Sequence, residues 1–129
     1  MKATLQSASG YQGNELDLPV KDVEAAIPFY EQFLGFVVEG RDGGREHNAV
    51  LTRDGIRIGL AENGRDPEQD GCAFRVDSAE AAREEFKARG LQAVSEIKTE
   101  KQGDASFKVF YVVAPDGLCY WFGERMAEH

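Results

Sequence analysis

Asp54-Gly55-Ile56-Arg57-Ile58-Gly59-Leu60-Ala61-Glu62 recurs in pattern, at a constant offset of 62 residues, as Asp116-Gly117-Leu118-Cys119-Tyr120-Trp121-Phe122-Gly123-Glu124. Both runs begin with Asp-Gly, carry apolar residues at the same alternate positions and end with Glu. Upstream, Leu16–Val20 corresponds to Cys72–Val76, and each is followed by a helix-like stretch that ends at a glycine, Gly35 or Gly90. The chain is therefore predicted to contain one supersecondary unit twice.

The first unit has the pattern of a strand, a helix and three strands. Glu15–Val20 alternates polar and apolar residues, as a half-buried strand does. Asp22 is a suitable N-cap for a helix that stops at Gly35, and Pro28 inside that helix predicts a kink or a late start. Asp-Gly turn signals separate the three strands that follow, which we expect at 36–40, around 47–52 and at 56–61.

The second unit repeats this order. Strand Cys72–Val76 precedes Ser78, the expected N-cap of a helix that ends at Gly90. Further strands are expected near Ala93–Lys98, Phe107–Val113 and Leu118–Gly123. We divide the chain into an N-terminal arm (1–13), a first βαβββ module (14–63), a linker (64–71), a second βαβββ module (72–124) and a tail (125–129), all in one structural domain.

Neither module is expected to stand alone, because a four-stranded sheet with one helix leaves its other face bare. Two modules side by side predict an α+β fold: a curved, mixed sheet of eight strands with the helices on its convex face. The concave face then forms a cup in which a ligand can bind.

Composition excludes several classes of partner. The formal net charge of −8 disfavours nucleic acid and anionic membrane, since both are bound mainly through an excess of Lys and Arg. No apolar run approaches the ~20 residues that span a bilayer, and the first residues lack a signal-peptide core. The two cysteines, Cys72 and Cys119, have neither zinc-type spacing nor the density of a disulfide framework. We therefore expect a cytoplasmic protein.

Three features of the chain occur together in one known superfamily: the two paired modules, the run Val20–Tyr30 closing on Leu34-Gly35-Phe36, and the late Pro115-Asp116-Gly117. They resemble the vicinal oxygen chelate superfamily, which holds glyoxalase I, extradiol dioxygenases, fosfomycin-resistance enzymes and bleomycin-resistance binding proteins. The resemblance extends from about residue 14 to 124. It implies the fold predicted above, whereas the same fold hosts lyases, dioxygenases, transferases and non-catalytic binders.

The resemblance also implies a divalent metal in the cup, with ligands from the first and last strands of each module. The first-strand positions fall on Glu15 and Gly71, and the last-strand positions on Gly59 and Trp121. Only Glu15 carries a donor side chain, and a catalytic divalent ion needs at least three protein ligands. We therefore predict no metal and no other cofactor. A displaced site built from Glu15, His47 and another carboxylate is the alternative.

The alternation predicts which side chains face the cup. They are Glu15, Asp17, Pro19, Arg57, Gly59, Ala61, Gly71, Ala73, Arg75, Cys119, Trp121 and Gly123. The small residues are expected to make room. Trp121 either stacks on a planar or cationic ligand or fills the volume of the missing metal site. Arg57 and Arg75 either bind a ligand carboxylate or phosphate or pair with the two cup acids.

Two cup residues are candidates for chemistry. Glu15 is the best general base if the protein catalyses a reaction, because partial burial raises the pKa of a carboxyl group. Its alternative is a hydrogen-bonded or arginine-paired carboxylate. Cys119 could act as a nucleophile, yet the only internal histidine that could activate it is His47.

The favoured hypothesis is a metal-free binding protein of the bleomycin-resistance type that sequesters or senses a small molecule in the cup. Its ligand-binding residues are expected to be Trp121, Arg57, Arg75, Asp17, Gly59, Gly71 and Cys119. The resemblance further implies a homodimer. The rival hypothesis is a glyoxalase-like lyase or isomerase, or a dioxygenase, that uses a displaced metal site or Glu15 as base. A scaffold with a collapsed cup is the third.

Overall fold

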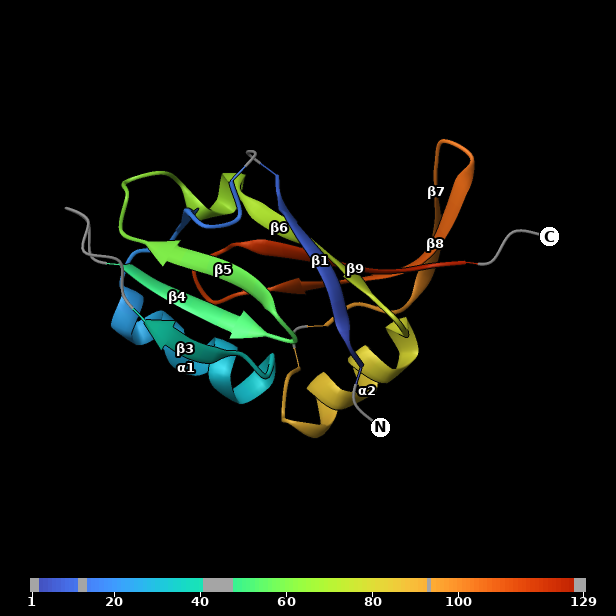
Figure 1. Cartoon of the computed structure of the whole chain (residues 1–129), viewed down its shortest axis with the longest axis horizontal. Coiled ribbons are helices and arrows are strands. Elements are labelled where there is room, and N and C mark those ends of the chain that lie inside the picture. The colour runs from blue at the N-terminus through green and yellow to red at the C-terminus, as the bar shows by residue number, and fades with distance from the viewer. Residues whose placement is uncertain (1–2, 12–13, 41–47, 93, 127–129) are drawn as a thin grey trace.

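The structure is a computed structural model that describes residues 3–11, 14–40, 48–92 and 94–126. Within these residues the strands form two sheets (Figure 1). The first sheet has the order β2 (Leu18–Pro19), β5 (Ile56–Ala61), β4 (Asn48–Arg53), β3 (Val37–Gly40). The second has the order β1 (Leu5–Gly10), β6 (Gly71–Val76), β9 (Cys119–Arg125), β8 (Ala105–Val113), β7 (Lys98–Gln102).

Two helices, α1 (Val23–Phe33) and α2 (Ala79–Ala88), lie on the same side of the sheets, at the lower edge of Figure 1. A short 3-10 helix, η1 (Pro67–Gln69), lies in the connection between β5 and β6. The predicted α+β class is confirmed. The prediction of a single eight-stranded sheet is wrong, because the described residues form nine strands divided between a four-stranded and a five-stranded sheet. No helix in the described ranges is both long and apolar enough to cross a membrane.

The strand order is the same in both sheets once β1 is set aside. In each, the strand before the helix pairs in parallel with the last strand of the module, β2 with β5 and β6 with β9. The remaining pairs, β5–β4–β3 and β9–β8–β7, are antiparallel. The duplication seen in the sequence is thus a duplication of topology.

The segment predicted as an N-terminal arm contains a strand that the sequence analysis does not predict. Residues Leu5–Gly10 form β1, which pairs antiparallel with β6, so that Ser9 lies opposite Ala73. Only Leu5 of this strand is fully buried, and the rest is small and polar, so its sequence lacks an apolar period. β1 pairs along the edge of β6 that the second module leaves open, and it therefore lies as an extra strand between the two modules.

Three boundaries also shift. The predicted strand Glu15–Val20 shrinks to β2, because Asn14 accepts hydrogen bonds from the amides of Leu16 (3.0 Å) and Asp17 (3.2 Å) and bends the chain into a turn. The strand predicted near 93–98 is instead β7 at 98–102, joined to β8 by a tight turn at 103–104. Helix α1 starts directly after Asp22 and continues through Pro28, so its predicted late start is wrong.

The early start of α1 has a physical cause in the repeat. Asp22 accepts the amide of Ala25 (3.3 Å), and Glu62, the last residue of the first repeated run, accepts the amide of Val23 (3.0 Å). The equivalent Glu124 accepts the amide of Ala79 at the start of α2 (2.9 Å). Each module therefore uses its terminal glutamate to satisfy the unpaired amides at its own helix N-terminus.

One hydrophobic core joins the modules. Tyr30 of α1 packs edge-on against Tyr120 of β9 at 5.9 Å between ring centroids, and the two buried hydroxyls lie 2.5 Å apart. Phe36 of the first module contacts Phe74 of the second at 5.9 Å. Because these contacts cross between modules, neither half buries its apolar face alone, as the sequence predicts.

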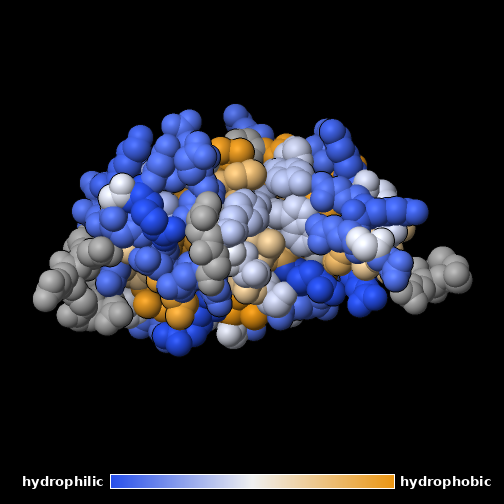
Figure 2. Space-filling model, turned by 90° about the horizontal axis from the view of Figure 1, so that it is seen from above, coloured by the Kyte–Doolittle hydropathy of each residue, from blue (hydrophilic) through white to orange (hydrophobic). Residues whose placement is uncertain are grey.

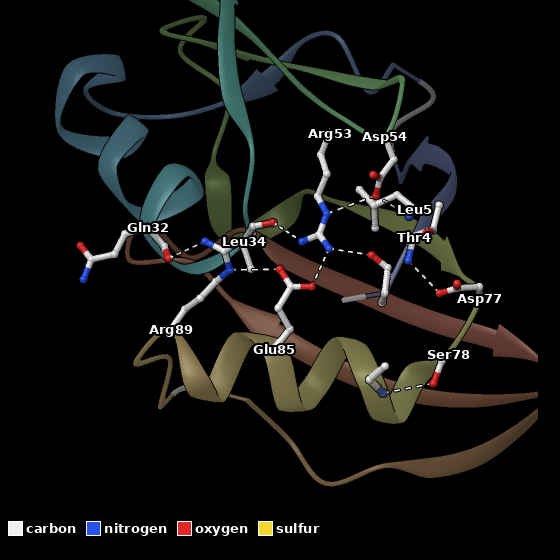
Figure 3. Close-up of polar contacts among 12 residues, drawn as sticks. Thr4, Leu5, Gln32, Leu34, Arg53, Asp54, Asp77, Ser78, Glu85 and Arg89 are labelled. Atoms are coloured by element: carbon white, nitrogen blue, oxygen red, sulfur yellow. Dashed lines mark hydrogen bonds and ion pairs between the residues drawn. The ribbon is translucent and has the colours of Figure 1, made fainter. Parts of the chain in front are cut away.

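A buried polar clasp reinforces the same junction (Figure 3). Arg53 of β4 donates to Glu85 of α2 (2.6 Å) and to the carbonyl oxygens of Leu34 (2.7 Å) and Ala3 (2.8 Å). Glu85 also accepts from Arg89 (3.0 Å). The clasp therefore connects the first module, the second module and the N-terminal segment through groups that are almost fully buried.

Candidate functional site

The face opposite the helices is the candidate functional surface, and its residues follow from the strand registers. In the second sheet it carries Gly71, Ala73, Arg75, Cys119, Trp121 and Gly123, as the alternation predicts. The other side of the same strands is fully buried against the helices. Seen from above in Figure 2, orange and pale atoms gather in the middle of the surface between strongly hydrophilic flanks.

Trp121 lies within this face rather than standing open above it, with only 7 % of its surface exposed. Its ring covers Gly123, where a Cβ atom would lie 2.2 Å from Trp121 Cη2, and it meets the Phe107 ring edge-on at 5.5 Å. Phe107, Val109 and Trp121 form a small apolar cluster separate from the main core. Of the two roles foreseen for Trp121, the geometry favours filling the volume of the cup.

Glu100 of β7 holds the polar atoms of this cluster. Its carboxylate accepts the indole N–H of Trp121 (3.2 Å) and the hydroxyl of Tyr111 (2.6 Å). The hydrogen bond to Glu100, together with partial burial, raises the pKa of Tyr111 to about 12. Neither Glu100 nor Tyr111 is among the site residues predicted from the sequence, because the predicted strands do not include the hairpin that brings β7 beside β8. The alternation of Ala105, Phe107, Val109 and Tyr111 is the signal that could have found them.

Arg75 lies beside the cluster, on β6. Its guanidinium carbon sits 5.2 Å from the centroid of the Phe107 ring. Its Nε is buried and has no hydrogen-bond partner. The predicted alternative, an ion pair with Glu15 or Asp17, is not formed.

A hollow of about 400 Å³ opens where β1 runs beside β5. Its walls carry two of the predicted site residues, Glu15 and Arg57. The remaining lining comprises Gln6, Ser7, Ala8, Leu16, Gly55 and Ile56. The side chain of Arg57 is 53 % exposed and pairs with Glu39 at 3.2 Å. The structure therefore brings Glu15 and Arg57 together and leaves Arg75 and Trp121 on the other side of β1.

The two glycines predicted to make room are covered by the chain itself. A Cβ atom on Gly59 would lie 2.1 Å from the carbonyl oxygen of Leu16, and one on Gly71 would lie 1.9 Å from that of Cys119. The ring of Tyr11 adds a second contact at Gly71 (2.5 Å). These glycines permit close approach of two backbone segments, so the expectation of open space at them is wrong.

Asp17 and Cys119 are engaged elsewhere. Asp17 accepts from Asn63 (3.1 Å) and pairs with Arg65 (3.5 Å) in the connection between the modules. Burial raises the pKa of the Cys119 thiol, and its hydrogen bond with Tyr11 opposes this shift. A thiol with a raised pKa is a poor nucleophile at neutral pH, so the geometry does not favour covalent chemistry at Cys119.

The residues at the four expected metal positions do not fit a divalent ion. Glu15 is the only donor among them, the faces of Gly59 and Gly71 are covered, and the indole N–H of Trp121 is bonded to a carboxylate. In the ranges that the structure describes, no three His, Cys, Asp or Glu side chains group closely enough to hold a metal. His47, required for the displaced site, and His129 lie outside the described residues.

Comparison with known proteins gives a match over most of the chain. The sequence model of the Glyoxalase/Bleomycin resistance protein/Dioxygenase superfamily matches residues 13–119. No curated protein matches the sequence.

Several solved structures share the fold. One is a bleomycin resistance determinant encoded on the transposon Tn5, with 24% identity, a TM-score of 0.69, and coverage of 84% of this chain and 93% of that one. A second is a bleomycin-binding protein complexed with bleomycin, with 24% identity, a TM-score of 0.68, and coverage of 84% of this chain and 93% of that one. A third is TnmS3, an antibiotic binding protein from Streptomyces sp. CB03234, with 21% identity, a TM-score of 0.66, and coverage of 88% of this chain and 95% of that one. At these identities the likeness establishes the fold alone.

Proposed function

Because the chain belongs to the Glyoxalase/Bleomycin resistance protein/Dioxygenase superfamily, we propose that it binds a small molecule on the face opposite the helices and does so without a metal ion. Structures that share its fold are described as a bleomycin-binding protein and an antibiotic binding protein. Those descriptions support binding as the activity of this chain. They leave the identity of its ligand open.

The observation that carries the proposal is the hollow beside β1. Its volume of about 400 Å³ falls within the ~300–1,000 Å³ typical of sites for small molecules. Leu16, Ile56 and Ala8 supply apolar surface, and Glu15 and Arg57 supply one group of each charge. Gln6 and Ser7 add neutral polar groups, so about half of the lining is polar, and polar groups of this kind fix the orientation of a ligand in such sites.

Arg57 is suited to ligand contact because its existing partner is replaceable. Both Arg57 and Glu39 are about half exposed, and an exposed ion pair contributes only about 0–1 kcal/mol. A ligand acceptor can therefore displace Glu39 at small cost. The backbone of Glu15 is hydrogen-bonded to the sheet, because its carbonyl oxygen accepts the amide of Gly59 at 2.9 Å. The side chain of Glu15 therefore extends from a fixed point of the backbone at the hollow.

The metal-free part of the proposal rests on the donor set described above. Binding then depends on shape, apolar contact and the two charged groups, and the chain needs no open coordination position. A homodimer and a cytoplasmic location stay predictions of the resemblance and the composition.

Calorimetric titration against a panel of aromatic and heterocyclic compounds tests this proposal. The variants Arg57→Gln and Glu15→Gln are expected to weaken the compounds that bind by about tenfold each, the effect of losing one hydrogen bond to a charged group. Arg83→Gln is the matched control, because Arg83 on α2 pairs with Glu96 away from the hollow. Equal affinities in all three variants would place the ligand elsewhere. Turnover of a compound by the metal-stripped protein would instead favour an enzyme.

A further inference from the structure

Arg75 differs from the other arginines of the described residues in having no polar partner. Arg53, Arg57, Arg65, Arg83 and Arg89 each form an ion pair, for example Arg53 with Glu85 (2.6 Å), Arg65 with Asp70 (2.8 Å) and Arg83 with Glu96 (3.3 Å). Within the same residues the guanidinium of Arg75 makes no hydrogen bond and no ion pair, and its Nε is buried without an acceptor. A permanent cation with five donors is thus left without an acceptor among the described residues.

The side chain is nevertheless held in place. Its guanidinium lies over the Phe107 ring at 5.2 Å, a cation–π geometry. Nε is buried without a partner, whereas neither Nη group is buried in this way or hydrogen-bonded to another described residue, so the Nη groups are the ones that reach the surface. Arg75 therefore presents a fixed pair of N–H donors on the face opposite the helices, spaced to match the two oxygens of a carboxylate or phosphate.

The charges around Arg75 favour an anion, although the whole chain is acidic. The registers place Lys98, opposite Val109, and Arg125, opposite Phe107, on the same face as Arg75. The acid that the registers place among them is Glu100, and its carboxylate already accepts hydrogen bonds from Trp121 and Tyr111. Local charge on this part of the face is therefore positive within a chain of net charge −8.

We infer that Arg75 binds an anionic group, a carboxylate or a phosphate, of a small molecule. Phe107 lies beneath the guanidinium, and Trp121, which is almost fully buried, packs against Phe107. Ser7, which lies opposite Arg75 on β1, also lines the hollow, so the anion site adjoins the proposed site. The inference rests on the proposed function and names the chemical class of its ligand.

Four probes test it: benzoate, phenyl phosphate, the neutral isostere benzamide and inorganic phosphate. Trp121 is the only tryptophan of the chain and touches Phe107, so its fluorescence reports binding directly. We expect benzoate or phenyl phosphate to bind at least about tenfold more tightly than benzamide, because a charge-assisted bidentate pair is replaced by a neutral contact. Whichever of the two anions binds more tightly identifies the group. Benzamide binding as tightly as both anions would overturn the inference.

Arg75→Gln should remove the preference for anions and leave benzamide affinity unchanged, whereas Arg83→Gln should leave both unchanged. Should Arg75→Gln fail to fold, a ¹⁵N–¹H spectrum of the unaltered protein decides the question. Benzoate or phenyl phosphate must then shift the guanidinium resonances of Arg75 more than those of Arg57. Binding of benzamide without any binding of the anions would overturn the inference and leave the proposed function standing. Failure of the whole compound panel would overturn both.

Discussion

Replacing Glu85 by alanine should destabilise the whole fold, because this residue is the acidic centre of the clasp shown in Figure 3. Its side chain is 6 % exposed and bonds to Arg53 at 2.6 Å and to Arg89 at 3.0 Å. The partner Arg53 is 7 % exposed and cannot lose its proton. The substitution therefore leaves a buried cation without its main counter-ion.

The size of the effect depends on the hydrogen bonds that Arg53 retains in the variant. Removing one partner of a buried pair typically costs about 3–5 kcal/mol of unfolding free energy. Arg53 retains its bonds to the carbonyl oxygens of Leu34 and Ala3, and a longer pair with Asp54 at 3.3 Å. The loss should accordingly fall near the lower end, at about 3 kcal/mol. Such a loss is a large part of the ~5–15 kcal/mol that stabilises a domain.

Urea unfolding followed by circular dichroism measures this loss, with Trp121 fluorescence as a second probe located in the second module. Glu96→Ala is the matched control, because Glu96 is 85 % exposed and its pair with Arg83 should contribute less than about 1 kcal/mol. The double variant Arg53→Met/Glu85→Leu should recover only part of the loss: no buried charge remains, but the carbonyl oxygens of Leu34 and Ala3 lose their donor. If Glu85→Ala unfolds at the same urea concentration as the control, the clasp does not hold the modules together as argued.

Three further perturbations have defined outcomes. Gly71→Ala should lower the free energy of unfolding by about 1–3 kcal/mol, because its Cβ atom would clash with the carbonyl oxygen of Cys119. In the same urea assay Gly40→Ala should change this free energy little, because a Cβ atom at Gly40 meets no atom within 4 Å. Tyr30→Phe should lower the free energy of unfolding by about 1–2 kcal/mol, because it leaves the Tyr120 hydroxyl buried without its partner. The double variant with Tyr120→Phe should lose less than the sum of the two single variants, and additive losses in thermal unfolding would contradict this. The pKa of Tyr111 rises from 10.0 to about 12 in the fold, so its contribution to stability should be complete below pH 10 and lost as the pH rises through 12. In the variant Glu100→Gln, ultraviolet titration should find this pKa closer to its ordinary value. An unchanged titration would exclude Glu100 as the cause.

Most of the architecture could be predicted because the repeat constrains it twice. Ser78 and Asp22 mark the helix starts, and the alternation separates the buried face of β6 and β9 from the face opposite the helices. Strand β1 could not be predicted, since its residues are small and polar and it is held by the edge of β6, which is far away in the sequence. Strand propensity does not identify a strand whose formation depends on a tertiary contact.

The candidate site was predicted only in part for a related reason. Side-chain direction follows from local periodicity, and Arg57, Arg75 and Trp121 lie on the expected face. What covers each position depends on segments that cross the sheet. The backbone of Leu16 fills the space at Gly59, and β1 separates Glu15 from Trp121. Size and alternation alone do not contain that information.

Native mass spectrometry of the intact protein, before and after chelation and with the panel of aromatic compounds, tests most directly whether the chain binds its ligand without a metal. Metal-free binding predicts a complex whose mass equals the chain or its oligomer plus an organic ligand, unchanged by chelation. A stoichiometric divalent metal in that complex, or loss of the ligand after chelation, would contradict it.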